Sequence, residues 1–215
     1  MNKLVVFDLD GTLINSVYGI AQAVNRTRHD YALEPLSPEL ITTFVGDGAY
    51  KLMERSLADA DKAVPLEEAV QKMTQHYADD PTYETRLYAG TAAGLAELKK
   101  DHWIVCIISN KPALVGQKII KELNIAPWID ENIGGGMGYP LKPQPDALLY
   151  LMQKYHAAPG NTWVVGDNHT DIFLAANGGA RSIFCTYGFG HKAASASSFD
   201  AASFAEAVEI LQANQ

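Results

Sequence analysis

Strand-like and helical segments alternate through the C-terminal half of this 215-residue chain. Four apolar runs have the length and residue types of buried strands: 103–109, 129–135, 162–167 and 182–188. Four segments between and after them carry apolar residues at helical spacing: 112–123, 146–155, 171–179 and 204–214. Alternation of this kind predicts a parallel sheet with right-handed crossovers and helices on both faces. The expected fold class is therefore α/β, with a doubly wound, Rossmann-like core.

A further strand is expected near the N-terminus, where the stretch KLVVFDLDGTL occupies residues 3–13. Residues 14 to about 85 then show helical patterns interrupted by prolines, and no convincing strand. This distance is too long for a simple crossover to the next strand, so we expect an inserted helical domain. The predicted division is a core made of 1–14 and 86–215, with a helical cap at 15–85. Long insertions at the carboxyl end of a strand commonly cover a site.

Charge and composition narrow the class of protein. The net charge of −8 argues against nucleic acid or an anionic membrane as a partner. No apolar run approaches the length of a membrane span, and the N-terminus reaches Asp8 too early for a secretory signal. Cys106 and Cys185 lie in strand-like runs, which favours buried, reduced thiols. We expect a cytoplasmic protein, monomeric or homodimeric.

Polar residues stand where the predicted strands end. Ligands of open α/β sheets bind beyond the carboxyl ends of the strands, and parallel winding brings these ends to one edge. We therefore expect a single pocket that contains the following side chains: Asp8, Asp10, Ser109, Asn110, Lys142, Asp167 and Asp171.

The acidic residues determine what this pocket can hold. Two carboxylates about 5 Å apart repel by roughly 3 kcal/mol at an effective dielectric constant near 20. Lys142 can offset one negative charge, and a hard divalent cation such as Mg²⁺ can offset two more. A lysine beside a metal suits a phosphoryl group, whose oxygens can complete the metal's coordination. Backbone N–H groups in the Gly11 turn are a further favourable contact for phosphate.

Four segments in this order resemble the motifs of the haloacid dehalogenase-like hydrolases: DLDGTL (8–13), IISNK (107–111), LKPQP (141–145) and VVGDNHTD (164–171). The inserted helical region resembles the cap of that family. The segments FVGDGAYKLMERSL (44–57) and LYAGTAAGLAELK (87–99) look like parts of phosphoglycolate phosphatases.

The resemblance implies a role for each catalytic residue. Asp8 would attack phosphorus and form an aspartyl phosphate, which splits one difficult step into two easier ones. Asp10 would protonate the departing oxygen and then deprotonate water. Ser109 and Asn110 would bind the phosphoryl oxygens, and Lys142 would hold the charges of phosphoryl group and nucleophile. A helix N-cap before Pro112 is the alternative role for Ser109.

The resemblance also implies a metal site and a substrate-binding turn. Mg²⁺ would bind Asp8, Asp167 and the carbonyl of Asp10, with Asp171 more suited to holding a water or a lysine than the metal itself. Gly11 and Thr12 would bind substrate through their turn, which Thr12 would also support.

The predicted function is a Mg²⁺-dependent phosphatase that hydrolyses a small phosphorylated metabolite, with phosphoglycolate as the leading candidate. A phosphomutase or pyrophosphatase on the same scaffold is an alternative, as is a non-catalytic phosphate-binding module. Two positions depart from the common pattern of the family, Asn15 and Asp47. An acidic residue at 47 would be expected to repel the carboxylate of phosphoglycolate.

Overall fold

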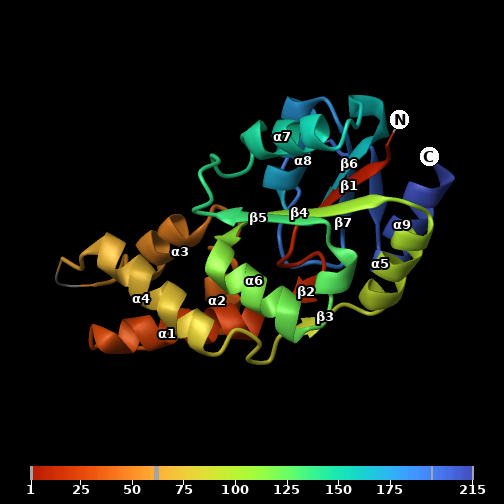
Figure 1. Ribbon diagram of the computed structural model, residues 1–215. Helices are drawn as coiled ribbons and strands as arrows, with labels where there is room; N and C mark the ends of the chain where they lie inside the picture. Colours follow the sequence, from red (N-terminus) through yellow and green to blue (C-terminus); the bar gives the residue numbers. More distant parts are fainter. Residues whose placement is uncertain (1, 61–62, 195, 215) are drawn as a thin grey trace.

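The computed structural model describes residues 2–60, 63–194 and 196–214. The two ends of the predicted core (1 and 215), residues 61 and 62 of the predicted cap and residue 195 lie outside these ranges. In the described part, the chain folds around a six-stranded sheet with the order β5-β4-β1-β6-β7-β8, in which every neighbouring pair is parallel (Figure 1). Its strands are β1 (Leu4–Phe7), β4 (Ile104–Pro112), β5 (Glu131–Gly135), β6 (Thr162–Gly166), β7 (Arg181–Cys185) and β8 (Phe199–Ala201).

Helices cover both faces of this sheet (Figure 1). Side chains of β1 alternate between two apolar clusters, so that Val5 and Phe7 face one layer and Leu4 and Val6 the other. The first layer comprises α5 (Thr91–Lys100), α6 (Ala113–Glu122) and α9 (Phe204–Ala213); the second comprises α7 (Asp146–Lys154) and α8 (His169–Gly178). Single-turn 3₁₀ helices lie at Ala126–Trp128 and Pro159–Asn161. The predicted doubly wound fold is confirmed.

The strand order fixes where a site can form. From β1 the chain proceeds to β4 and β5 on one side, and then returns to β6, β7 and β8 on the other. The direction of winding therefore reverses around β1. A crevice opens at such a reversal, outside the carboxyl ends of the strands.

In the described residues of the insertion after β1 (up to 60 and from 63 on) there are four helices: α1 (Val17–Asp30), α2 (Pro38–Thr42), α3 (Ala49–Ser56) and α4 (Leu66–Asp79). They lie together beside the core in Figure 1. The chain enters and leaves them through a short antiparallel pair, β2 (Ile14–Asn15) and β3 (Arg86–Leu87). The predicted boundaries at 14/15 and 85/86 fall on this pair; the division into two domains stays a prediction. We refer to α1–α4 and their connections, residues 16–85, as the cap.

Several short elements were not predicted from the sequence. Strands β2 and β3 have two residues each and β8 has three, too few for a periodic pattern. Helix α2 has five residues, and its Pro38 follows the capping residue Ser37, a helix start that looked like an interruption in the sequence. Strand β4 runs to Pro112, beyond its predicted end at 109. None of the described helices has the length and apolarity needed to cross a membrane.

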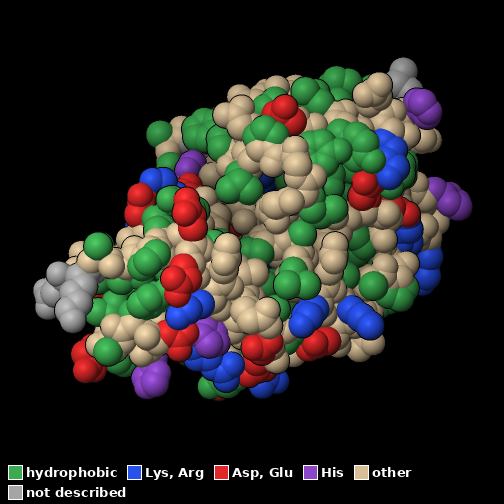
Figure 2. All heavy atoms as spheres, turned by 60° about the vertical axis from the view of Figure 1, so that its left-hand side comes forward, with side chains coloured by type: hydrophobic (Ala, Val, Ile, Leu, Met, Phe, Trp, Pro, Cys, Tyr) green, Lys and Arg blue, Asp and Glu red, His purple; other side chains and the backbone are tan. Residues whose placement is uncertain are grey.

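Acidic and basic side chains are interspersed on the face that shows the cap (Figure 2). Unlike these surface side chains, Arg28 is fully buried inside the cap. Its Nε donates to the carbonyl of Glu34 (2.7 Å), and its guanidinium binds both carboxylate oxygens of Asp59 (2.7 and 2.8 Å) and the carbonyl of Ser56. This one side chain therefore joins α1 to two other parts of the cap, the segment after α1 and the end of α3 with the residues that follow it.

Replacing Arg28 should destabilise the protein. We expect Arg28→Met to lower the free energy of unfolding by about 3 kcal/mol, because the buried carbonyl of Ser56 and the part-buried carbonyl of Glu34 lose their donor. Arg26→Met is the matched control: Arg26 is exposed and lies 3.9 Å from Asp80, so its loss should cost less than about 0.5 kcal/mol. Urea unfolding measures both values. Equal effects of the two substitutions would contradict the role assigned to Arg28.

Candidate active site

The carboxyl ends of three adjacent strands bring most of the predicted residues together. Asp8 follows β1, Ser109 and Asn110 lie in the last part of β4, and Asp167 follows β6. All four side chains line one cavity beneath the cap. The clustering of polar residues at one edge of the sheet is thus as predicted.

A buried ammonium group links two of the carboxylates. The Nζ of Lys142 lies 2.8 Å from Oδ1 of Asp8 and 2.7 Å from Oδ1 of Asp171. Burial alone would lower the pKa of Lys142, but the two carboxylates raise it above its ordinary value. The second oxygen of Asp171 accepts the backbone N–H of Asn168 (3.0 Å) at the start of α8. Asp171 therefore fixes both Lys142 and the first turn of that helix.

The loop after β7 holds Asp167. The N–H groups of Phe189 and Gly190 both donate to its Oδ2, at 3.0 and 2.7 Å. A Cβ on Gly188 would lie 2.3 Å from the Cβ of Asp167, so only glycine permits this approach. The sequence predicted a strand up to residue 188, but β7 ends at Cys185 and Gly188 lies in this loop. The signal available in the sequence was the spacing of Gly188 and Gly190.

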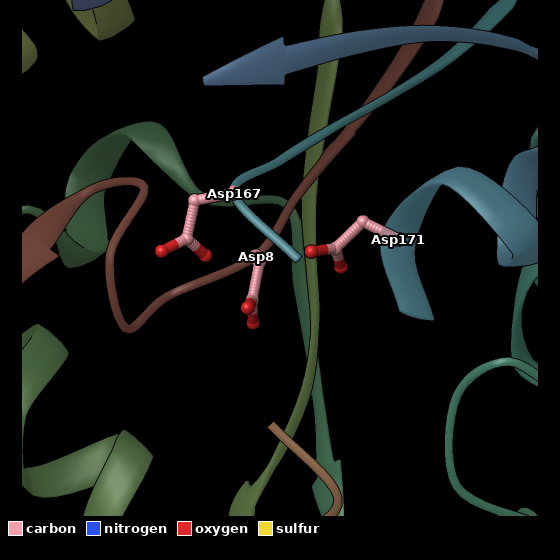
Figure 3. Close-up of side chains that lie close together, drawn as sticks. All are labelled: Asp8, Asp167 and Asp171. Carbon is pink, nitrogen blue, oxygen red and sulfur yellow. The ribbon is translucent and has the colours of Figure 1, made fainter. Parts of the chain in front are cut away.

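Three carboxylates form a group that could hold a metal ion. One oxygen each from Asp8, Asp167 and Asp171 lies within 4.8 Å of the others. Figure 3 shows that they come from the end of β1, the end of β6 and the start of α8. The carboxylate of Asp10 is not in this group. Gly11 leaves space for the carboxylate of Asp167, because a Cβ at position 11 (φ +81°) would lie 1.9 Å from Oδ2 of Asp167.

The electrostatics of this group favour a cation. Burial, and repulsion by Asp171 and Asp10, outweigh the effect of Lys142 and raise the pKa of Asp8 to about 6. Burial and repulsion by Asp8 and Asp171 likewise raise the pKa of Asp167 well above its ordinary value. A cation bound between these carboxylates would stabilise their ionised forms.

Lys111 is a site residue that the sequence reasoning missed. Its Nζ lies 2.8 and 3.1 Å from the two oxygens of Asp10 and 2.8 Å from the hydroxyl of Tyr77 on α4. Burial opposes its charge, but Asp10 raises the pKa of Lys111 above its ordinary value. It belongs to the IISNK motif, where only Ser109 and Asn110 were given roles.

Ser109 and Asn110 have different surroundings from those expected. Helix α6 begins after Pro112 without a side-chain cap, so the alternative of Ser109 as an N-cap is wrong. The Oγ of Ser109 accepts the backbone N–H of Lys111 (3.3 Å). Asn110 donates to the carbonyls of Gly46 (2.9 Å) and Lys142 (3.1 Å) and accepts the N–H of Lys142 (2.8 Å). Asn110 therefore joins the cap to the loop of Lys142; its binding to phosphate stays a prediction.

The cavity is small and has two kinds of wall. Its volume is about 60 Å³, which suits a few water molecules or a small ligand. The core contributes polar groups, and the cap contributes a mainly apolar wall: Ile20, Val45, Gly46, Gly48, Ala49, Leu52, Met73 and Tyr77. Gly11 and Thr12 do not line the cavity; their role in substrate binding stays a prediction.

Asp47 does not line the cavity either, although Gly46 and Gly48 do. Its carboxylate lies 2.6 Å from the guanidinium of Arg55, which also donates to the carbonyl of Phe44 (3.0 Å). The charge of Asp47 is therefore directed to Arg55, which weakens the expected repulsion of an anionic substrate.

Comparison with known proteins agrees with this geometry. A family model described as haloacid dehalogenase-like hydrolase matches residues 5–185. The chain belongs to this family. It is 32% identical over 196 residues to a phosphoglycolate phosphatase of Mannheimia succiniciproducens, with 88% of each chain covered. A phosphoglycolate phosphatase of Vibrio parahaemolyticus is 31% identical over 218 residues, with 97% of this chain and 96% of the relative covered.

A crystal structure described as a predicted phosphoglycolate phosphatase from Haemophilus somnus has the same fold. Its TM-score is 0.90 at 28% identity, and the match covers 97% of both chains. The resemblance to haloacid dehalogenase-like hydrolases is thus confirmed, and the protein is a phosphatase.

The raised pKa of Asp8 predicts how stability varies with pH in EDTA. Between about pH 4 and pH 6 the native chain binds more protons than the unfolded chain, so the free energy of unfolding falls as the pH rises. We expect this residue to lower it by about 3 kcal/mol across the window. Urea unfolding of wild type and Asp8→Asn measures the effect as the difference between the two pH profiles, which includes the part that Asp8 exerts through the titration of Asp167. Parallel pH profiles would contradict the prediction.

Proposed function

We propose that the protein is a Mg²⁺-dependent phosphomonoesterase that hydrolyses a small phosphorylated metabolite through an aspartyl phosphate on Asp8. The observation that carries this proposal is the position of Asp8. Its carboxylate lies at the end of β1, held by Lys142, within a group of three carboxylates and on the wall of a small covered cavity.

The contacts of Asp8 favour one of its oxygens as the nucleophile. Oδ1 accepts the backbone N–H of Leu9 (2.7 Å) and lies 2.8 Å from Lys142. Both contacts leave Oδ2 as the oxygen for attack. A bond from Oδ2 to phosphorus would form as the bond to the alcohol oxygen breaks.

Asp10 would transfer the protons of both steps. It would give a proton to the departing alcohol oxygen, and would then take one from the water that attacks the aspartyl phosphate. This second step releases inorganic phosphate and restores the carboxylate of Asp8. Asp10 lines the cavity with Asp8, and its own carboxylate is held by Lys111 and Ser16. The cap would exclude bulk water from both steps.

The donor set fits Mg²⁺. Asp8 and Asp167 offer the hard oxygen ligands that this ion takes, and Asp171 lies beside them with its oxygens bound to Lys142 and the N–H of Asn168. Four acidic groups (with Asp10) and two ammonium groups (Lys111 and Lys142) leave two negative charges when all are ionised, which a divalent cation balances. When bound, the ion supplies positive charge for the phosphoryl oxygens. Lys142 would hold the nucleophile and a phosphoryl oxygen in place beside it.

Phosphoglycolate is the leading candidate substrate. Curated relatives of about the same length are phosphoglycolate phosphatases. The cavity is small enough to favour a compact ester, and the pairing of Asp47 with Arg55 weakens the main objection raised by the sequence.

Asp8→Asn is the direct test of this proposal. We expect the substitution to reduce phosphate release from phosphoglycolate by at least about 10³-fold, because the amide is a poor nucleophile. Asp146→Asn is the matched control, because Asp146 is exposed on the first turn of α7. Phosphate release is measured with Mg²⁺ and with EDTA, and EDTA should abolish it.

Three outcomes would contradict the proposal. Activity retained in Asp8→Asn would require another nucleophile. Transfer of the phosphoryl group to another phosphorylated metabolite, with little release of phosphate to water, would indicate a mutase. Binding of phosphate by the wild type, without turnover of any ester, would indicate a binding module.

A further inference from the structure

Lys111 is the charged side chain that connects the cap to the predicted acid–base residue. We infer that Lys111 and Tyr77 are positioning residues, which hold the carboxylate of Asp10 for proton transfer when the cap covers the cavity. This inference rests on the proposed function. It adds that the position of the cap determines how firmly the carboxylate of Asp10 is held.

The contacts of Lys111 account for every N–H group of its ammonium. An ammonium has three donors. Three acceptor atoms surround the Nζ of Lys111, namely the two oxygens of Asp10 (2.8 and 3.1 Å) and the hydroxyl of Tyr77 (2.8 Å). The Nζ also lies 4.0 Å from the centre of the Tyr77 ring, a favourable cation–π distance. The side chain is therefore fixed from two sides, one in the core and one in the cap.

Because these contacts are buried, the loss of one of them should have a large effect on the position of Lys111. Lys111 is 7% exposed and Tyr77 3%, so water cannot easily replace a contact that is lost. Removing the Tyr77 hydroxyl would leave one donor of a buried ammonium without a partner. The ammonium would then shift, and Asp10 would lose part of its support.

The second partner of Asp10 is also connected to the cap. The Oγ of Ser16 donates to Oδ1 of Asp10 at 2.5 Å. Ser16 is fully buried and directly precedes α1, at the entrance to the cap. Both side chains that hold the carboxylate of Asp10 therefore depend on the placement of cap helices α1 and α4. A displacement of about 1 Å in a reacting group can cost about 10²-fold in rate.

The test compares two phosphate esters that differ in their need for a proton. The departing oxygen of 4-nitrophenyl phosphate is a good leaving group, whereas that of 2-hydroxyethyl phosphate requires protonation. The ratio kcat/KM reports the steps up to release of the alcohol, so the later hydrolysis of the aspartyl phosphate does not enter.

We expect Lys111→Met to lower kcat/KM about 10- to 100-fold for 2-hydroxyethyl phosphate and less than about 3-fold for 4-nitrophenyl phosphate, since proton transfer contributes roughly 10²–10⁴-fold. Tyr77→Phe keeps the ring and should give a smaller loss with the same selectivity. This milder variant also serves if Lys111→Met does not fold. In the double variant, the loss caused by Tyr77→Phe should disappear, because it acts through Lys111.

Lys118→Met is the matched control. Lys118 lies on α6 of the core and donates to the carbonyl of Ala78 in the cap (2.6 Å), so it joins the same two parts through the neighbour of Tyr77. It does not line the cavity. We expect both esters to keep their wild-type kcat/KM in this variant.

Several results would overturn the inference. Equal losses for the two esters would assign Lys111 a structural or phosphate-binding role. Phosphoglycolate is assayed beside the two esters, and a loss confined to it would make Lys111 a contact for the substrate's carboxylate. Additive effects of Lys111→Met and Tyr77→Phe on kcat/KM would show that the two residues act independently, and so that Lys111 is not coupled to the cap through Tyr77. Full activity of Asp8→Asn would overturn the proposed function as well, whereas the other three results affect Lys111 alone.

Discussion

The structure depends on one electrostatic constraint, the burial of several carboxylates at the end of β1. Asp8, Asp167 and Asp171 are buried and repel one another, and Lys142 offsets only part of their charge. Much of the surrounding chain serves to keep them in place. The loop after β7 directs two N–H groups at Asp167, and Gly11 leaves room for that carboxylate. The charge that remains favours a bound cation, the role that the proposed function gives to Mg²⁺.

The sequence predicted the sheet because its signal is repetitive. Each long strand is an apolar run, and each long helix has an apolar stripe, so the alternation was visible and the winding rules supplied the topology. Asp8, Asp167 and Lys142 could be assigned to one pocket for the same reason, since they follow strands that meet at one edge. The elements β2, β3 and β8 were missed, because strands of two or three residues are defined by their partners and not by a local pattern.

Side-chain partners were predicted less well than positions. Nothing in IISNK indicated that Lys111 would turn towards Asp10 and reach Tyr77, a residue 34 positions away. Asn110 was assigned to phosphate, but its amide pairs with the backbone of Lys142 and with Gly46. The contacts with Tyr77 and Gly46 arise when the cap packs against the core, and those with Asp10 and Lys142 arise when distant core segments meet. They depend on three-dimensional contacts between segments that carry no common sequence pattern.

The paired strands β2 and β3 have a consequence for the exchange of caps between related enzymes. Because the chain leaves and re-enters the core at adjacent points, a foreign helical insert could be grafted between them without changing the order of the main sheet. Such a graft would still need a serine at the start of its first helix and a hydroxyl group that meets the lysine at the end of β4. In a chimaera that lacks them, the cavity would be covered but the carboxylate of Asp10 would lose two of its contacts.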